Sequence, residues 1–141
     1  FMQRRYGVAV DPDTEVQPLI GSKEGLAHLI LAYTEPGTAC LMPSLSYPTY
    51  IRATHIGGGD MVQLPMNADN GFMPDVDALP EDVCRRAKLL LVNYPNNPTG
   101  AIAPRAYYEK LVAFCRRWGI VLVSDLAYGE VTFDGYRCEA V

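Results

Sequence analysis

The sequence predicts a three-layer α/β/α fold, in which helices cover both faces of a mostly parallel sheet. Short apolar runs alternate along the chain with longer amphipathic segments, and this alternation is typical of successive βαβ units. Glycine and proline residues separate the two kinds of segment, as at Gly37 and Gly119. A length of 141 residues is enough for one domain with a sizeable core.

The first half of the chain is expected to contain two complete helices and two strands. The expected elements are the end of a helix at 1–6, an extended segment at 15–20, a helix at 26–33, a strand at 38–42, a helix at 47–55 and a strand at 60–65. The first full helix is closed by Glu35-Pro36-Gly37, and three consecutive glycines from Gly57 end the second.

The second half of the chain repeats the alternation. The expected elements are a helix at 75–86 interrupted by Pro80, a strand at 88–92, a helix at 104–118, a strand at 120–123 and a strand-like run at 131–133. Pro104 suits the first turn of a helix, because that position does not use its backbone donor. Gly119 stands where a helix C-cap belongs.

Composition narrows the class of protein. Apolar residues make up 49% and charged residues 20%, which indicates a soluble globular protein. The net charge of -4 offers no attraction to nucleic acid or an anionic membrane. No apolar run approaches the ~20 residues that span a bilayer, and the first residues lack a signal-peptide pattern. We therefore expect a cytoplasmic protein.

No metal or disulfide framework is predicted. The four cysteines are far apart and contain no Cys-x-x-Cys pair, so reduced thiols are expected. His28 and His55 fall inside expected helices, with no second ligand three or four residues on.

Gly21-Ser22-Lys23-Glu24-Gly25 forms a small-residue turn that opens a helix. Unpaired backbone donors and the helix dipole make such a turn a natural phosphate seat, to which Ser22 adds a hydroxyl and Lys23 a positive charge. The spacing is not that of a nucleotide P-loop. Serine at this place can equally be an N-cap, and lysine a solvated side chain.

Three polar residues follow two apolar runs and would emerge at the carboxyl ends of strands, where open α/β sheets bind ligands. Asn97 lies in Asn93-Tyr94-Pro95-Asn96-Asn97-Pro98-Thr99-Gly100, and its amide can donate to a phenolate or a carboxylate. Asp125 directly follows a strand, so its carboxylate must be solvated, hydrogen-bonded or paired. Tyr128 lies three residues on, and the acid and the phenol can hold two sides of one aromatic ring.

Each of these residues also has a purely structural interpretation. The Asn97 segment can be an ordinary tight turn, and Asp125 can be a helix N-cap. Tyr47, after a strand, can lay its ring against a planar ligand or pack on the surface of the domain.

Taken in order and spacing, these motifs resemble the cofactor site of the fold-type I pyridoxal-phosphate enzymes, the aspartate aminotransferase superfamily. Within it, four segments look most like the LL-diaminopimelate aminotransferases, namely Arg4-Arg5-Tyr6-Gly7, Leu19 to Gly25, Asn93 to Gly100 and Phe133-Asp134-Gly135-Tyr136. The resemblance covers essentially the whole chain. Leu45 stands where relatives usually carry proline.

The resemblance implies a role for each residue toward pyridoxal 5'-phosphate. Ser22 and Lys23 would hold the phosphate, with Lys23 also near the substrate. Tyr47 would stack on the pyridine ring and help bind the substrate. Asn97 would donate to the phenolic oxygen of the ring and seat the substrate carboxylate.

Two further roles complete the implied site. Tyr128 would donate to the same phenolic oxygen, and Asp125 would pair with the protonated pyridine nitrogen. A carboxylate there keeps the ring cationic, so that it can accept the electrons left when a substrate proton departs.

The implied activity is transfer of an amino group from an amino acid to a 2-keto acid by a homodimer. The Schiff-base lysine of the family would lie beyond Val141, since Lys23, Lys88 and Lys110 do not match its position. Residues 1–141 are then part of the large cofactor-binding domain, without the small C-terminal domain, and are expected to be inactive alone. A C-S lyase or decarboxylase of the same fold, a ligand-sensing domain and a pseudoenzyme stay open as alternatives.

Overall fold

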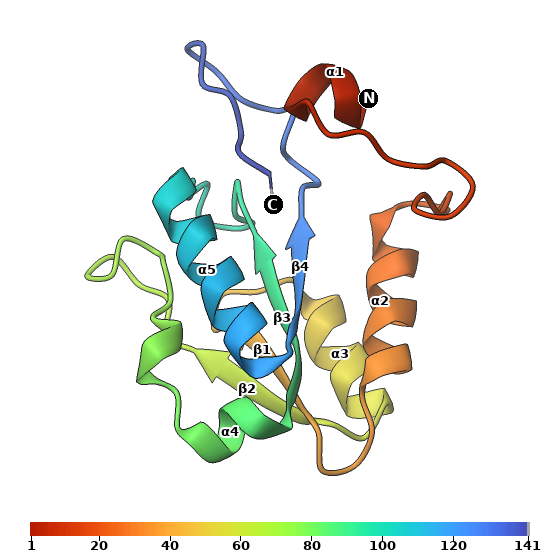
Figure 1. Cartoon of the computed structure of the whole chain (residues 1–141). Coiled ribbons are helices and arrows are strands. Elements are labelled where there is room, and N and C mark those ends of the chain that lie inside the picture. Colours follow the sequence, from red (N-terminus) through yellow and green to blue (C-terminus); the bar gives the residue numbers. More distant parts are fainter. Residues whose placement is uncertain (141) are drawn as a thin grey trace.

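The computed structural model describes residues 1–140 and shows a four-stranded sheet between two helical layers (Figure 1). The strands are β1 (Ala39–Pro43), β2 (Asp60–Leu64), β3 (Ala87–Asn93) and β4 (Val121–Asp125). They lie in the order β2-β1-β3-β4, and every neighbouring pair is parallel. The predicted α/β/α class is therefore confirmed.

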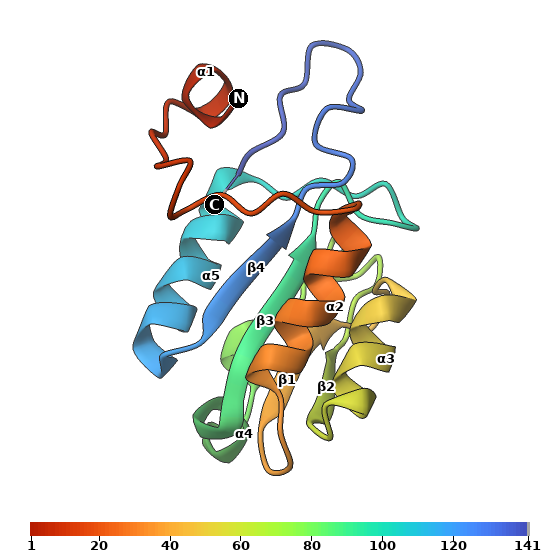
Figure 2. The same ribbon diagram turned by 90° about the vertical axis from the view of Figure 1, so that its right-hand side faces the viewer.

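Helices cover both faces of this sheet. The helices on these faces are α2 (Ser22–Tyr33), α3 (Pro48–Ile56), the short 3-10 helix η1 (Val76–Ala78), α4 (Glu81–Arg86) and α5 (Arg105–Trp118). A further helix, α1 (Met2–Tyr6), has no buried residue and lies beyond the strand ends (Figure 2). Helices α2 and α3 pack side by side on one face, and α5 lies on the other (Figures 1 and 2).

The alternation of side chains along the central strands produces a core on each face. On β3, Leu90 and Val92 point toward α5, whereas Leu89 and Leu91 point toward α2 and α3. All four are essentially inaccessible to solvent. A continuous apolar run is typical of a parallel strand buried on both faces, which is why this run was a reliable signal.

In the second half, one sequence prediction was confirmed and another was wrong. The helix expected at 75–86 is interrupted at Pro80, as predicted, and consists of two pieces, η1 and α4, because Leu79 precedes Pro80 and is held extended at φ -73° and ψ 138°. Residues 131–133 form no strand: Val131 and Phe133 are 60% and 77% exposed and pair with no neighbour. β-branched and aromatic residues favour a strand when they can pack on a half-buried sheet, and residues 131–133 have no such sheet beside them within residues 1–140.

Other differences lie at element boundaries. Helix α2 begins at Ser22, four residues earlier than predicted. Just before the helix, the backbone N–H of Ile20 donates a hydrogen bond to the Glu24 carboxylate at 2.7 Å. Pro104 is the N-cap of α5 and precedes its first turn. Gly119 does cap α5, at φ 68° in the left-handed region. Residues 15–20 join no sheet.

The carboxyl ends of β3 and β4 reach the same edge of the sheet as α1 and the chain after residue 125 (Figure 2). Arg5 of α1 and Glu130 form an ion pair of 2.9 Å there. Within residues 1–140 no helix is long and apolar enough to cross a membrane, and no cluster of three or more His, Cys, Asp or Glu residues could hold a metal ion. The four cysteines are buried free thiols.

Candidate functional site

All six site residues predicted from the sequence line one cavity of about 140 Å³, which we call the strand-end pocket. It lies at the carboxyl ends of β3 and β4, against the first turns of α2 and α3. Its lining residues are Ser22, Lys23, Leu26, Tyr47, Asn93, Asn97, Asp125, Ala127 and Tyr128. Residues more than 100 positions apart in the sequence thus meet where a parallel sheet is expected to bind a ligand.

The amino end of α2 forms one wall. Gly21 is the N-cap at φ 80° and ψ 152°, and no side chain accepts from the first backbone donors of the helix. Ser22 is the first helical residue, so the N-cap alternative for its hydroxyl is wrong. Lys23 places a cation beside the positive end of the helix dipole, an arrangement that a bound anion would stabilise.

Tyr47 forms a second wall, as the N-cap of α3. Lys23 Nζ lies 5.7 Å from the centroid of its ring, and hydrogen bonding with Lys23 lowers the pKa of the Tyr47 phenol. The ring is half-buried in the pocket and does not pack on the outside of the domain. Leu45, in place of the usual proline, still allows Tyr47 to reach the pocket.

Asp125 is the last residue of β4, and both of its carboxylate oxygens are hydrogen-bonded. Oδ2 accepts from the Tyr50 hydroxyl at 2.7 Å, and Oδ1 accepts from the Ala127 N–H at 3.1 Å. A turn over 127–130 follows, with no helix, so the helix N-cap alternative is wrong. The half-buried carboxylate is held in place by neutral donors and has no cationic partner among the described ion pairs.

Tyr50 is a residue that sequence reasoning missed. Its side chain is fully buried, and burial, followed by the hydrogen bond to Asp125, raises the pKa of its phenol far above the usual value. Tyr50 therefore stays a protonated donor. Its ring meets that of Tyr47 edge-on, with centroids 6.2 Å apart. The available signal was the spacing of three residues, which puts both tyrosines on one side of a helix.

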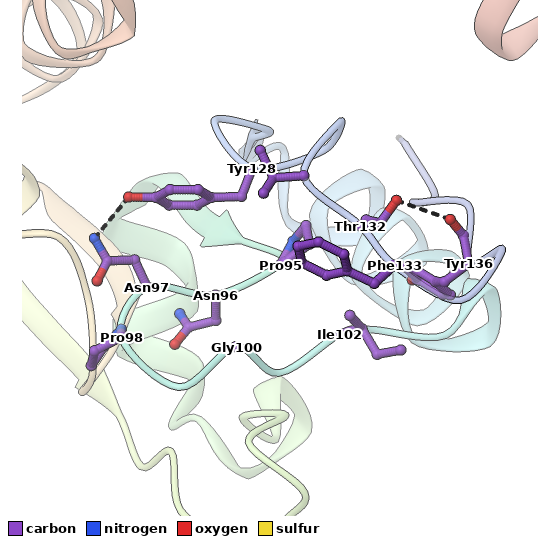
Figure 3. A pocket seen from close by; sticks show the side chains of 11 residues that line it. Pro95, Asn96, Asn97, Pro98, Gly100, Ile102, Tyr128, Thr132, Phe133 and Tyr136 are labelled. Carbon is purple, nitrogen blue, oxygen red and sulfur yellow. Dashed lines mark hydrogen bonds between the residues drawn. The ribbon is translucent and has the colours of Figure 1, made fainter.

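The Asn97 and Tyr128 side chains meet at the opposite side of the pocket. Asn97 Nδ2 donates to the Tyr128 hydroxyl oxygen at 3.1 Å, as Figure 3 shows. The turn that carries Asn97 is closed by backbone bonds between Asn96 and Ala101 and between Gly100 and Asn96, each of 2.8 Å. An amide and a phenol are thus presented together to whatever occupies the pocket.

A second, more apolar cavity of about 610 Å³, shown in Figure 3, adjoins this wall. Asn97 and Tyr128 line both cavities. Ile102, Val131 and Phe133 contribute exposed apolar side chains to it. Of the six predicted site residues, this second cavity includes Asn97 and Tyr128 alone, whereas the strand-end pocket includes all six.

Comparison with known proteins agrees with this geometry. The family model described as aminotransferase class I and II matches residues 1–141, the whole chain. The chain belongs to this family. It is 50% identical over 137 residues to an LL-diaminopimelate aminotransferase of Moorella thermoacetica and 51% identical to one of Syntrophobacter fumaroxidans. Each match covers 97% of this chain and 35% of the relative, so the chain spans about a third of their length.

Solved aminotransferase-family structures have the same fold. Substrate-bound BacF of Bacillus subtilis superposes with a TM-score of 0.92 at 38% identity, over 98% of this chain and 35% of that one. A probable N-succinyldiaminopimelate aminotransferase of Thermus thermophilus gives a TM-score of 0.89 at 42% identity, over 97% and 37%. The chain therefore has the fold-type I architecture of this family.

Proposed function

We propose that the full-length protein is a pyridoxal-phosphate-dependent aminotransferase that moves an amino group between an amino acid and a 2-keto acid. The observation that carries this proposal is the convergence of six residues, predicted from separate segments, on one strand-end pocket. LL-diaminopimelate is the first candidate amino donor, because the relatives about 50% identical to this chain are named for it.

The donor set fits pyridoxal phosphate. The open first turn of α2, with Ser22 and Lys23, suits a phosphate dianion. Tyr47 offers an aromatic face for a planar ring. Asn97 and Tyr128 offer an amide and a hydroxyl for a phenolate oxygen, and Asn97 can also orient a substrate carboxylate. A phosphate, a ring and a phenolate each have a partner.

Asp125 would hold a proton on the pyridine nitrogen. When bound, the cofactor supplies an electron sink for cleavage of a bond at the substrate α-carbon. An anionic carboxylate next to the ring nitrogen favours the protonated form of that nitrogen, because opposite charges stabilise each other in a partly desolvated site. Tyr50 and the Ala127 N–H keep this carboxylate fixed in orientation.

The lysine that links the cofactor covalently belongs, in this proposal, to the protein beyond residue 141. Of the three lysines in the chain, only Lys23 lines the pocket. Lys110 forms ion pairs with Asp75 at 2.6 Å and Asp77 at 2.9 Å on the surface. Lys88 is exposed on β3. The small C-terminal domain, a homodimeric state and a cytoplasmic location are likewise expectations from the family.

The test uses the full-length protein with LL-diaminopimelate and a 2-keto acid. We expect Asp125→Ala to retain bound cofactor while turnover falls about 100-fold or more, since an electrostatic partner of the reacting system is removed. Asp69→Ala is the control, because Asp69 lies in an exposed loop outside the pocket. Cofactor absorbance and formation of the new amino acid are measured.

Other outcomes separate the alternatives. Near-normal turnover of Asp125→Ala would reject the role of Asp125. Release of a thiol, pyruvate and ammonia from a cysteine S-conjugate, without amino transfer, would indicate a C-S lyase, and release of carbon dioxide from an amino acid would indicate a decarboxylase. Cofactor binding without turnover of any amino acid would indicate a ligand-sensing domain or a pseudoenzyme.

A further inference from the structure

Asn93 lines the strand-end pocket and is not one of the six site residues predicted from the sequence. It is the last residue of β3, is 5% exposed, and pairs in register with Asp125 of β4. Its side chain lies between the two loops that carry the polar groups of the pocket. A buried amide must satisfy both its donor and its acceptor, so its partners indicate what it holds together.

The two hydrogen bonds of Asn93 join those loops. Nδ2 donates to the backbone carbonyl of Asp125 at 2.9 Å, and Oδ1 accepts from the backbone N–H of Asn97 at 2.9 Å. Asn97 in turn donates through Nδ2 to the Tyr128 hydroxyl at 3.1 Å. These three hydrogen bonds, together with the backbone from Asp125 to Tyr128, form a closed cycle of contacts through Asn93 and Asn97.

Few side chains could replace asparagine in this cycle of contacts. Aspartate has the same size and can accept from Asn97, but it has no donor and would turn an oxygen toward the carbonyl of Asp125. Alanine leaves both backbone groups without a partner, in a position where water has little access. Both the donor and the acceptor of an amide are therefore used.

We infer that Asn93 is a positioning residue, which sets the separation between Asn97 and Asp125 so that both can engage the same cofactor ring. This inference rests on the proposed function. Asn93 acts through the two backbone groups that it holds, and its effect is therefore expected in cofactor affinity and in the orientation of the bound ring.

The experiment compares full-length wild type with Asn93→Ala and Asn93→Asp. Apoprotein is titrated with pyridoxal phosphate, and the induced circular dichroism of the bound cofactor reports the orientation of its ring. Thermal melting of each apoprotein is recorded as well. Asn93→Asp keeps the size and the acceptor, and it decides the question if Asn93→Ala does not fold.

Asn70 provides a matched control. Its Oδ1 accepts from the Asn67 N–H at 3.0 Å, and its Nδ2 donates to the Pro65 carbonyl at 2.8 Å. It therefore bridges two backbone groups as Asn93 does, but in a loop outside the pocket. Asn70→Ala removes the same kind of contact without touching either polar loop.

We expect both Asn93 variants to bind pyridoxal phosphate about tenfold more weakly, the size of effect that follows loss of a buried hydrogen bond. The induced dichroism should change in shape, whereas Asn70→Ala should keep the wild-type affinity and spectrum. Lower melting temperatures for the Asn93 variants, with unchanged affinity and dichroism, would overturn the inference and leave Asn93 a structural residue. Failure of wild type to bind the cofactor would instead reject the proposed function, before any variant is compared.

Discussion

At the scale of single residues, Asp125 illustrates what a sequence pattern can and cannot predict about a site. A carboxylate directly after an apolar strand indicated a group that needs partners, and its position in the pocket agrees with that expectation. Its partners were not foreseeable, because Tyr50 lies 75 positions away and reaches Asp125 only through the packing of α3 on the sheet. Sequence spacing identified the groups that line the strand-end pocket, but it did not reveal the buried groups that hold them.

Tyr50→Phe tests the contact between Tyr50 and Asp125. The variant keeps the ring in the core but removes the donor to Oδ2, so we expect unfolding to become easier by about 1 to 2 kcal/mol. Turnover by the full-length protein should fall because Asp125 is less firmly oriented. Denaturant unfolding and steady-state kinetics provide the measurements.

Tyr107→Phe is the control for that variant. Tyr107 is also buried, and its hydroxyl donates to the Pro74 carbonyl at 2.8 Å, away from the strand-end pocket. A similar loss of stability is expected, with normal turnover. Equal turnover by both variants would show that the Tyr50 hydroxyl does nothing more than stabilise the fold.

At the scale of elements, the proposed phosphate site depends on how α2 begins. Gly21 has φ 80° and ψ 152°, a combination that is nearly restricted to glycine. Gly21→Ala should therefore cost about 1 to 3 kcal/mol of stability and displace the first turn that carries Ser22 and Lys23. We expect weaker binding of pyridoxal phosphate, measured by titration of the full-length apoprotein.

Gly119→Ala is the matched change at another helix end. Gly119 caps α5 at φ 68° and ψ 32°, so alanine should cost about 1 to 2 kcal/mol there as well. It lies at the amino end of β4, opposite the pocket, and cofactor affinity should stay normal. If the two variants bind the cofactor equally well, the geometry at Gly21 is not needed for the phosphate.

Most helices and strands were predictable, and the exceptions share a cause. Buried strands such as β3 and glycine-capped helices such as α5 carry local signals strong enough to define them. Helix α2 began earlier than predicted, because its start depends on Gly21 and a contact from Glu24. Residues 131–133 have strand-forming side chains but no neighbouring strand, and pairing is not a local property.

At the scale of the whole molecule, the parallel order of the strands brings the pocket together. Because β3 and β4 are neighbours and run in the same direction, the loops after Asn93 and Asp125 must meet at one edge. This consequence of the fold class was predictable from the sequence. The precise contacts across the pocket depend on packing and were not.

Because two of its thiols are buried, we expect the folded protein to lose stability at alkaline pH. Burial raises the pKa of Cys40 and of Cys115 to about 11, from 9.0. The unfolded chain loses these protons at lower pH than the folded chain does, so their stabilising contribution is complete below about pH 9 and is lost as the pH rises toward 11. Denaturant unfolding of the full-length protein at several pH values should show this decline.

Cys40→Ala separates this effect from other alkaline effects. The variant is expected to be less stable at neutral pH, because it leaves a small cavity in a fully buried position. Its stability should nevertheless fall less steeply between pH 9 and pH 11. An identical slope for wild type and variant would contradict the shifted pKa of Cys40.

A crystal structure of the full-length protein grown with pyridoxal phosphate would test the proposed cofactor site most directly. We predict the phosphate at the amino end of α2, within hydrogen-bonding distance of Ser22. We also predict the ring against Tyr47, with its nitrogen facing Asp125. Cofactor bound elsewhere, or a ring nitrogen turned away from Asp125, would contradict the assignment of the strand-end pocket as the cofactor site.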